Sequence, residues 1–176
     1  MLPREDARDV LILTGALRDR VRRIADLPQG ARIGTASQRR RAQLLALRPD
    51  LECGMLRGNV ETRLAKVESG AFDATLLALA GLRRLGLDPL PGIALAPEDM
   101  LPAAGQGAIG IEIRAGDDAL AAMLAAIDDP ATALAVSAER ACLAELDGSC
   151  RTPIAVHAAP EAGENGQIRA LVALPD

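Results

Sequence analysis

The sequence predicts an α/β fold, in which a parallel sheet is covered by helices and is followed by part of a small α+β unit. Three strand–helix units follow one another between Ala31 and Gly86, at a spacing that is typical of parallel sheets. The chain is 49% hydrophobic and only 1% aromatic, so its core must be aliphatic. Its 176 residues suffice for one complete domain and parts of others.

The chain begins with a polar connector, Met1–Asp9, which is followed by the short apolar run Val10–Leu13. A weak helical pattern follows over Ala16–Ala25. The three repeated strands are then expected at Ala31–Thr35, Leu51–Leu56 and Ala74–Leu79. Helices follow them, ending near Leu47, Glu68 and Gly86, with Ser37 and Asn59 as N-caps of the first two.

The second half of the chain has a different pattern. Residues Leu87–Pro102 are rich in proline and are expected to be irregular. Ala108–Ile113 alternate between apolar and other residues, which predicts a strand. Two helices are expected, over Asp117–Ile127 and Pro130–Leu146, and Asp129 is a suitable N-cap for the second because proline favours the first helical position. Residues 152–176 are expected to form two strands around a turn at 161–166.

Composition excludes several classes of function. The net charge is −4, and a chain with one Phe, no Trp and no Tyr offers no platform on which bases could stack, so we expect no nucleic-acid partner. No apolar run approaches the length of a membrane span. The three cysteines lack CxxC spacing, which argues against zinc and against a disulfide scaffold. We therefore expect a soluble, cytoplasmic protein that needs neither a membrane nor a metal.

Arginines cluster after each of the three repeated strands. Arg39, Arg40 and Arg41 follow the first strand, whereas the later strands are followed by the clusters Arg57 with Arg63 and Arg83 with Arg84. Ligands of open parallel sheets bind outside the carboxyl ends of the strands, and guanidinium groups suit carboxylates and phosphates. Solvated surface residues are the alternative interpretation. Three clusters at equivalent strand ends favour a crevice that binds a polyanion.

Other candidate features give weaker signals. The glycine-rich Gly105-Gln106-Gly107 lacks the complete pattern of a nucleotide-binding loop. Spacing alone makes Cys150 an ordinary loop cysteine after a helix, where the helix dipole would not lower the pKa of a thiol. Cys53 and Cys142 are expected in a strand and a helix core, and His157, the single histidine, is expected to be structural.

The order of several motifs resembles the porphobilinogen deaminases (hydroxymethylbilane synthases), and the resemblance runs over nearly the whole chain. The matching stretches begin with Arg4-Glu5-Asp6-x-Arg8-Asp9, Gly34-Thr35-x-Ser37-x-Arg39-Arg40 and Leu56-Arg57-Gly58-Asn59-Val60-x-Thr62-Arg63-Leu64. They continue with Ala80-Gly81-Leu82-x-Arg84-Leu85-Gly86, Leu101-Pro102-Ala103-x-Gly105-Gln106-Gly107-Ala108, Ala138-Glu139-Arg140 and Leu146-x-Gly148-x-Cys150-x-x-Pro153-Ile154. So many collinear motifs make a chance match very improbable.

The resemblance implies a function. These enzymes are transferases of porphyrin and heme biosynthesis, which add four porphobilinogen units stepwise, release ammonia each time and form hydroxymethylbilane. Their dipyrromethane cofactor is attached covalently to a cysteine, and Cys150 stands at that position. The resemblance assigns Ser37, Arg39, Arg40 and Arg57 to the cofactor. It assigns Arg63 and Arg84 to the substrate, and it leaves open whether Arg41 and Arg83 bind carboxylates as well.

The resemblance also implies an organisation. We expect residues 1–9 to be a connector from a first domain that is absent, and residues 10–102 to be a central domain resembling periplasmic binding proteins. Residues 103–127 would return to the first domain, and residues 128–176 would be a partial cofactor-anchoring domain. The family's catalytic aspartate is expected in the absent part, so we expect little or no turnover from this chain alone. The expected partners are porphobilinogen and the growing polypyrrole chain, bound by a monomer.

Two other interpretations remain at this point. The chain could be a non-catalytic module that binds anions or polycarboxylates on a fold like that of periplasmic binding proteins. Cys150 in its motif is the feature that distinguishes an enzyme from such a module. Alternatively, the chain does not fold independently, because its returning segment would lack a sheet.

Overall fold

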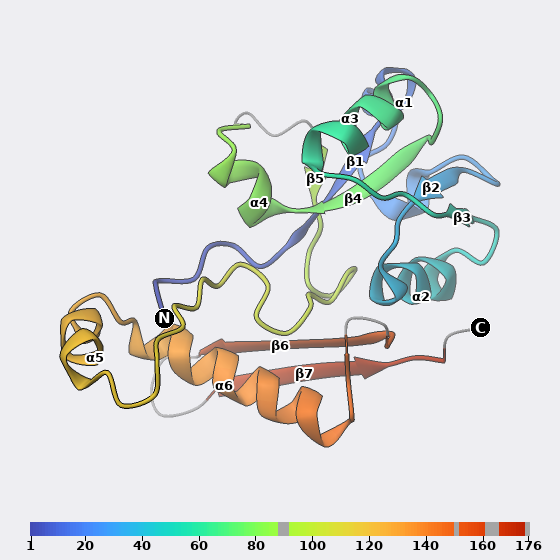
Figure 1. Cartoon of the computed structure of the whole chain (residues 1–176). Helices are drawn as coiled ribbons and strands as arrows, with labels where there is room; N and C mark the ends of the chain where they lie inside the picture. The colour runs from blue at the N-terminus through green and yellow to red at the C-terminus, as the bar shows by residue number, and fades with distance from the viewer. Residues whose placement is uncertain (88–91, 150–151, 161–165, 175–176) are drawn as a thin grey trace.

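The computed structural model describes residues 1–87, 92–149, 152–160 and 166–174. A unit built on a five-stranded sheet stands above a second unit, in which a long helix packs beside a two-stranded hairpin (Figure 1). The first unit contains β1 (Asp9–Leu13), α1 (Gly15–Arg18), the 3₁₀ helix η1 (Ile24–Asp26), β2 (Arg32–Gly34), α2 (Gln38–Leu47), β3 (Glu52–Gly54), α3 (Val60–Glu68), β4 (Ala74–Ala78), α4 (Leu79–Arg84) and β5 (Gly92–Ala94). Then come α5 (Asp118–Ala125), α6 (Pro130–Glu145), β6 (Ile154–Pro160) and β7 (Gly166–Val172).

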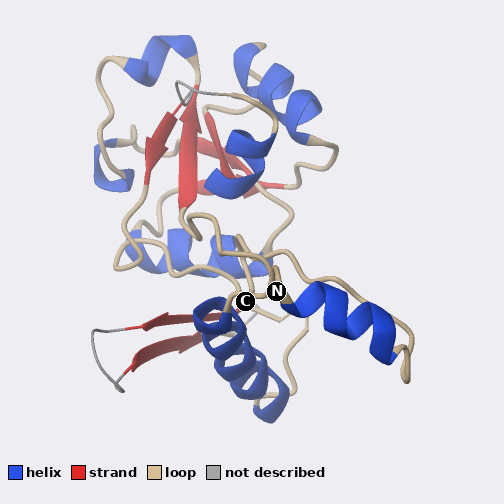
Figure 2. Ribbon diagram, turned by 90° about the vertical axis from the view of Figure 1, so that its left-hand side faces the viewer, coloured by secondary structure: helices blue, strands red, loops and turns tan. Residues whose placement is uncertain are grey.

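The five-stranded sheet has the order β3-β2-β4-β1-β5. Strand β2 pairs in parallel with both β3 and β4, which confirms the parallel arrangement predicted for the three repeated units. Strand β1 pairs antiparallel with β4 and with β5, so it runs against the other four strands. Helices lie on both sides of this sheet (Figure 2). The predicted α/β class is therefore confirmed, with one reversed strand that the sequence pattern did not predict.

Strand β1 is buried on both of its faces. Leu11 and Leu13 belong to one apolar cluster, whereas Val10 and Ile12 belong to the other. Because successive side chains of a strand point to opposite faces, four consecutive apolar residues fit a central strand that is covered on both sides. The reversed strand thus lies in the middle of the core and brings its first residue, Asp9, beside Ala78 at the end of β4.

The predicted N-caps are confirmed. The side chains of Ser37, Asn59 and Asp129 accept hydrogen bonds from the backbone N–H groups at the third helical positions of α2, α3 and α6. The donor–acceptor distances are 3.4, 2.9 and 2.7 Å, respectively. Each cap satisfies an N–H group that has no partner within its own helix, so these helix starts follow from local sequence.

Two elements of the first unit differ from the prediction. The helix expected over Ala16–Ala25 is replaced by the four-residue α1 and by η1, because the segment buries little apolar surface besides Val21 and Ile24. The proline-rich segment expected to be irregular contains β5, which pairs with β1. A three-residue strand among prolines gives no periodicity that a sequence pattern could detect.

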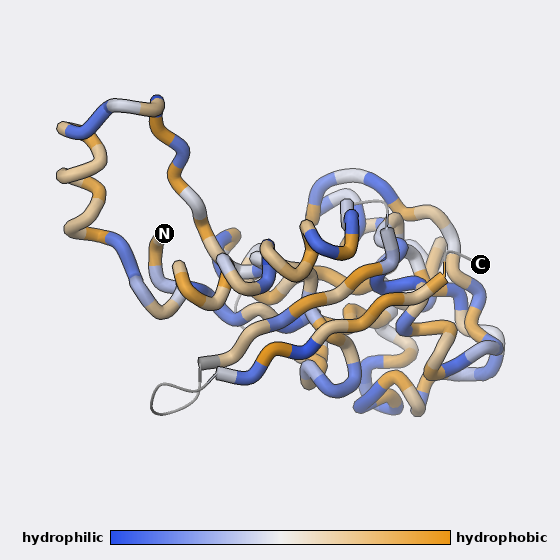
Figure 3. Tube along the Cα trace, turned by 90° about the horizontal axis from the view of Figure 1, so that it is seen from below, coloured by the Kyte–Doolittle hydropathy of each residue, from blue (hydrophilic) through white to orange (hydrophobic). Residues whose placement is uncertain are grey.

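The prediction of a strand at Ala108–Ile113 is wrong. This segment belongs to none of the sheets formed by the described residues, and Ile109 and Ile111 are 39% and 48% exposed. Its backbone is held near its start by hydrogen bonds from the Leu2 N–H to the Ile109 carbonyl and from the Glu5 N–H to the Gly107 carbonyl. The alternation is present in the sequence, but the described chain offers no strand to pair with it. The segment leads into α5, which projects from the body and has no buried residue (Figure 3).

The second unit consists of α6 and the antiparallel hairpin β6–β7, as two strands after a long helix predict. Most of the turn expected at 161–166 lies outside the described residues. Ile154, Ala155 and Val156 of β6 are buried, whereas most of β7 is exposed. Among the described helices, none alone is long and apolar enough to span a membrane, although α5 and α6 pass that test together as a pair bent by 115°.

Candidate anion-binding edge of the sheet

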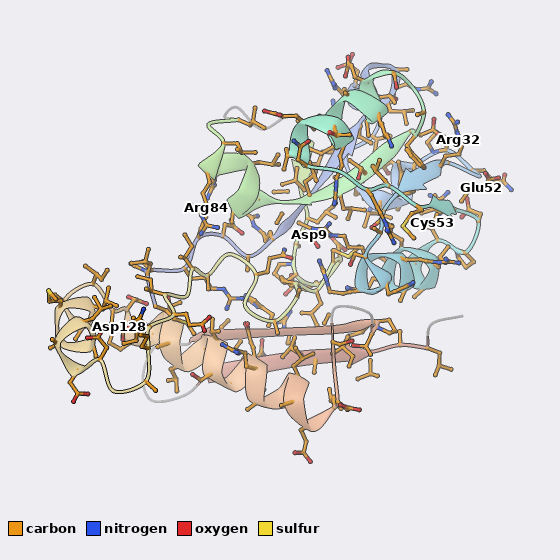
Figure 4. All side chains as sticks on the ribbon, in the orientation of Figure 1. Asp9, Arg32, Glu52, Cys53, Arg84 and Asp128 are labelled. Atoms are coloured by element: carbon orange, nitrogen blue, oxygen red, sulfur yellow. The ribbon has the colours of Figure 1, made fainter. Side chains whose placement is uncertain are left out.

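The carboxyl ends of β2, β3 and β4 lie at one edge of the sheet because the three strands are parallel. All of the predicted arginine clusters follow these ends, on α2, in the β3–α3 segment and on α4. The reversed strand β1 begins at the same edge, so the topology adds an acidic residue, Asp9, to a set of cations (Figure 4). This carboxyl edge is the candidate functional site.

Asp9 holds two of the predicted site residues. Its carboxylate is fully buried, and it accepts hydrogen bonds from Arg39 Nη1 at 2.8 Å and from Arg40 Nη2 at 2.7 Å. Burial alone would raise the pKa of Asp9, but the two guanidinium groups outweigh it and lower the pKa below its usual value. Asp9 is therefore ionised at neutral pH, as the centre of a buried ion triplet.

Most of the remaining polar groups of this triplet are also partnered. Arg39 donates to the Leu101 carbonyl at 2.6 Å, and Arg40 donates to the Leu76 carbonyl at 2.9 Å. Gln106 donates to Asp9 at 3.0 Å and accepts from Arg39 at 3.2 Å. Among the described residues, the Arg40 Nε–H is a buried donor without a hydrogen-bond partner. Buried charges are tolerated when they are paired and hydrogen-bonded in this way.

The structure therefore places Arg39 and Arg40 beneath the edge rather than on it. They are 5% and 9% exposed, so neither is a solvated surface residue. Their side chains meet Asp9 instead of open solvent, and their contact with a ligand stays a prediction. Ser37, the third predicted residue of this stretch, is half-buried and acts as the cap of α2.

The other predicted arginines lie nearer the surface. Arg57 is exposed, and no described residue accepts a hydrogen bond from its guanidinium. Arg63 is half-buried and donates through Nε to the Gly58 carbonyl at 2.8 Å. Burial lowers the pKa of Arg63, and the positive charge of Arg40 lowers it further. Arg40 and Arg63 therefore add to one positive region, although they come from different strand ends.

Helix α4 carries the third arginine cluster, whose side chains bond to the N-terminal segment and to the glycine-rich loop. Arg84 donates to the Gly107 carbonyl at 2.7 Å, and Arg83 pairs with Glu5 at 2.6 Å. Both arginines are exposed, so each retains N–H groups that can reach solvent. The edge thus has an outer layer of accessible cations, Arg57 and Arg84 among them, above the buried triplet.

Glu139 organises a second buried centre, between the two units. Arg4 donates to both of its carboxylate oxygens, at 2.7 and 3.1 Å. The backbone N–H groups of Gly105 and Ala158 donate to the same carboxylate at 2.6 and 2.7 Å. One fully buried side chain of α6 thereby joins the N-terminal segment, the glycine-rich loop and β6.

The backbone of the glycine-rich loop requires a glycine at position 107. A Cβ at Gly107 would collide with the carbonyl oxygen of Glu5, and the residue has φ +88°, a conformation that favours glycine. Gln106 is thereby directed at Asp9, and its Nε2 also donates to the Ala7 carbonyl at 2.6 Å. The loop thus supports the buried triplet, in a role that sequence reasoning missed.

Sequence reasoning also missed Asp9, Glu139 and Arg4 as organisers. All three stand in motifs that were singled out, yet the pattern did not show which residues they meet. Asp9 lies 30 and 31 positions from its two arginines, and Arg4 lies 135 positions from Glu139. A charged residue at the start of an otherwise apolar strand, as in Asp9-Val10-Leu11-Ile12-Leu13, was the available signal for a buried charge.

The three cysteines and the histidine do not form a site among the described residues. Cys150, the predicted cofactor anchor, lies outside them. Cys53 and Cys142 are free thiols, and burial raises the pKa of Cys53 although Arg41 opposes the shift. Burial, followed by the charge of Arg4, lowers the pKa of His157, which favours its neutral form. Within the described ranges, no group of three or more histidine, cysteine or acidic residues could hold a metal ion.

An edge of parallel strands with accessible and buried arginines is the arrangement expected of an α/β protein that binds anions. Comparison with known proteins identifies the family. Residues 1–122 match the family model described as "Porphobilinogen deaminase, dipyromethane cofactor binding domain", and residues 133–176 match "Porphobilinogen deaminase, C-terminal domain". The chain therefore belongs to the porphobilinogen deaminase family.

Individual relatives agree with this assignment. The chain is 54% identical over 175 residues to the porphobilinogen deaminase of Nitrobacter winogradskyi, which covers 99% of this chain and 54% of that protein. It is 51% identical over 176 residues to the chloroplastic enzyme of Pisum sativum, with 99% and 46% covered. The chain spans about half the length of the curated relatives it matches.

Among solved structures, the chain is similar to a periplasmic binding protein of Salmonella typhimurium with high arginine specificity. It is 15% identical, the match covers 74% of this chain and 59% of that one, and the TM-score is 0.44. The family assignment rests on the sequence matches alone.

Proposed function

We propose that this chain supplies the cofactor-anchoring and carboxylate-binding part of a hydroxymethylbilane synthase. The reaction is the stepwise condensation of four porphobilinogen units, with release of ammonia at each step. The observation that carries the proposal is the identity of about half of all residues with porphobilinogen deaminases over nearly the whole chain. The alternative of a non-catalytic anion-binding module is not favoured by this relationship.

The donor set at the carboxyl edge fits a dipyrromethane cofactor. Each of its pyrrole rings carries an acetate and a propionate, so a group with several carboxylates needs several cations. Arg57 and Arg63 supply accessible or half-buried guanidinium groups, and the buried Arg40 adds to the positive field around Arg63. We propose Cys150 as the covalent anchor. When bound, the cofactor supplies the pyrrole carbon to which the first substrate is joined.

In this proposal, residues of this chain bind the carboxylates of the pyrrole rings and orient the rings. Arg57 and Arg63 hold carboxylates after the end of β3 and in the first turn of α3, and Arg84, on α4, holds another carboxylate. Arg39 and Arg40 act beneath them, because Asp9 fixes both side chains in one orientation. Ser37 contributes by starting α2 at the point that places these arginines. Fixed cations of this kind avoid the cost of ordering side chains on binding.

Asp9 is not a proton donor for the reaction. Its pKa is lowered and both of its oxygens are bonded to guanidinium groups, so it remains ionised at neutral pH. We propose that Asp9 is not the carboxyl group that assists ammonia loss, and that this chain alone has little or no turnover. An assay for hydroxymethylbilane with the chain alone tests this point, and efficient turnover would contradict it.

Intact mass after expression with a supply of porphobilinogen tests the proposed anchor. The expected result is an increase equal to one dipyrromethane group, which is absent in Cys150→Ser and retained in Cys53→Ser. Cys53→Ser is the matched control because Cys53 is half-buried beside the same edge. An adduct that persists in Cys150→Ser would contradict the assignment, whereas an unmodified mass in the wild-type chain would show that the chain cannot assemble its cofactor.

We further propose that the chain works as a monomer in a reducing compartment such as the cytoplasm. The free thiols of Cys53 and Cys142 support a reducing setting. The Pisum sativum relative is named as chloroplastic, so the compartment can differ within the family. Light scattering during size-exclusion chromatography should give the mass of one chain, and a stable dimer would contradict the proposal.

A further inference from the structure

Two cavities adjoin each other along the exposed side of α2. The smaller, of about 110 Å³, lies at the carboxyl ends of β2 and β3, where Ser37 and Cys53 contribute to its lining. The larger, of about 320 Å³, lies between α2 and the segment that follows β7. Gln38 and Arg41 line both cavities. A trough therefore runs from the carboxyl edge, across the start of α2, to the second unit.

Arg41 is the cation at the junction of these cavities. It is exposed, and no described residue accepts a hydrogen bond from its guanidinium, whereas its neighbours Arg39 and Arg40 are both committed to Asp9. The charge of Arg41 acts within the smaller cavity, because it opposes the effect of burial on the pKa of the Cys53 thiol. Arg41 thus offers an uncommitted charge to a ligand in either cavity.

The walls of the larger cavity are apolar on both sides. Leu45 and two alanines of α2 form one wall, and Ala173 and Leu174 form the other. The second wall is anchored because the Ala173 N–H donates to the Pro153 carbonyl at 3.1 Å. A small-molecule site commonly combines apolar walls with a few polar groups that fix orientation. Apolar walls with a single arginine suit a flat pyrrole ring that bears carboxylates at its rim.

We propose that Arg41 is a further binding residue of this edge, which holds a carboxylate of the second and later pyrrole rings as a growing chain extends into the cavity between α2 and β7. The inference rests on the proposed function and deepens it. Arg57 and Arg63 lie after β3 and serve the rings at the strand ends, whereas Arg41 lies where the trough leaves the sheet. Arg41 therefore discriminates by length: it binds an oligopyrrole but gives no advantage to a single ring.

Two ligands of different length test this discrimination in calorimetric titrations of the whole chain. One is porphobilinogen, with one ring and two carboxylates. The other is a synthetic dipyrromethane with two acetates and two propionates, which lacks a leaving group and cannot attach covalently. Arg41→Gln should weaken binding of the dipyrromethane by about two- to fivefold, as expected for an ion pair open to solvent, and should leave porphobilinogen binding unchanged.

Two variants serve as controls for the titration. Arg57→Gln should weaken binding of both ligands, because Arg57 lies at the end of a strand. Arg20→Gln removes an exposed arginine from the segment after α1, beyond the far end of β1, and should change neither affinity. An equal loss for both ligands in Arg41→Gln, or no loss, would overturn the inference while leaving the proposed function intact. Failure of the wild-type chain to bind either ligand would overturn both.

Alkylation of Cys53 provides a second readout that does not depend on affinity alone. The thiol lines the smaller cavity, so a bound dipyrromethane should slow its reaction with iodoacetamide, followed by peptide mass spectrometry. In Arg41→Gln, without ligand, the reaction should also be slower, because loss of the nearby positive charge raises the pKa of the thiol. At the same concentration, the dipyrromethane should protect the Cys53 thiol less in Arg41→Gln than in the wild type. Equal protection in the two proteins would contradict a role for Arg41.

Discussion

Asp9 and Glu139 are both fully buried carboxylates, but they organise different regions. Asp9 gathers two arginines of one helix beneath the candidate binding edge of the first unit. Glu139 gathers one arginine and two backbone N–H groups from three separate segments, and so holds the second unit against the first. The difference is that the surroundings of Asp9 carry excess positive charge, whereas those of Glu139 combine one charge with neutral donors. We therefore propose that the first centre serves binding and that the second serves assembly.

The largest expected effect is that of Asp9→Asn. The substitution leaves two buried guanidinium groups without a counter-charge, and breaking a buried ion pair from one side costs about 3–5 kcal/mol. Urea denaturation at neutral pH measures the loss of unfolding free energy. Asp19→Asn, at an exposed position after α1, is the control and should be nearly neutral. A loss below about 1 kcal/mol in Asp9→Asn would show that the triplet does not stabilise the fold.

Glu139→Gln should have the next largest effect. The amide keeps an acceptor for only one of the two backbone donors, which bond to different oxygens of Glu139, and it loses the bidentate pair with Arg4, so we expect a cost of about 2–3 kcal/mol. Glu145→Gln on the exposed part of the same helix is the matched control. Limited proteolysis should cut near β6 and β7 faster in Glu139→Gln only. Unchanged cleavage there would contradict a role for Glu139 in holding the second unit.

The pH dependence of folding stability gives a further test of the Asp9 centre. Its pKa in the folded chain is lowered, so its ionised form stabilises the fold above the pKa of an unfolded aspartate, which is about 3.9. That contribution is lost as pH falls below 4 and through the lowered value. The stability difference between the wild type and Asp9→Asn should accordingly shrink from pH 5 to pH 3, measured by urea midpoints. A constant difference over this range would contradict the assignment.

The smallest effects are expected from the helix caps. Asn59→Ala removes an acceptor at 2.9 Å from the Thr62 N–H, and Ser37→Ala removes one at 3.4 Å from the Arg40 N–H. A lost cap costs about 0.5–2 kcal/mol, and the shorter bond should lie higher in that range. Thermal unfolding of the two variants tests the order. A larger loss in Ser37→Ala would indicate that Ser37 does more than cap α2.

The sequence was sufficient for features that depend on neighbouring residues. The three strand–helix units, the caps Ser37, Asn59 and Asp129, and the parallel edge follow from local periodicity and capping. These elements already place the arginine clusters at one end of the sheet. The family motifs predicted the role of Cys150, which lies outside the described residues.

Features that depend on distant partners could not be predicted in the same way. The arginines at 39 and 40 look like surface cations until β1 brings Asp9 beside them. The alternation of Ala108–Ile113 indicates a strand only if another strand is available, and the described chain provides none. Arg41 belonged to the first arginine cluster, but nothing in the sequence separated it from Arg39 and Arg40, because the wall formed by Ala173 and Leu174 comes from a distant part of the chain.

Hydrogen–deuterium exchange of Asp9→Asn and Glu139→Gln, followed side by side by mass spectrometry, tests the division of roles most directly. We predict that Asp9→Asn loses protection in β1, β4 and α2 while the β6–β7 hairpin keeps its wild-type protection. Glu139→Gln should lose protection in α6 and in β6–β7 while β1 and β4 remain protected. The same pattern of lost protection in both variants would contradict the claim that one buried carboxylate serves the binding edge and the other the joint between units.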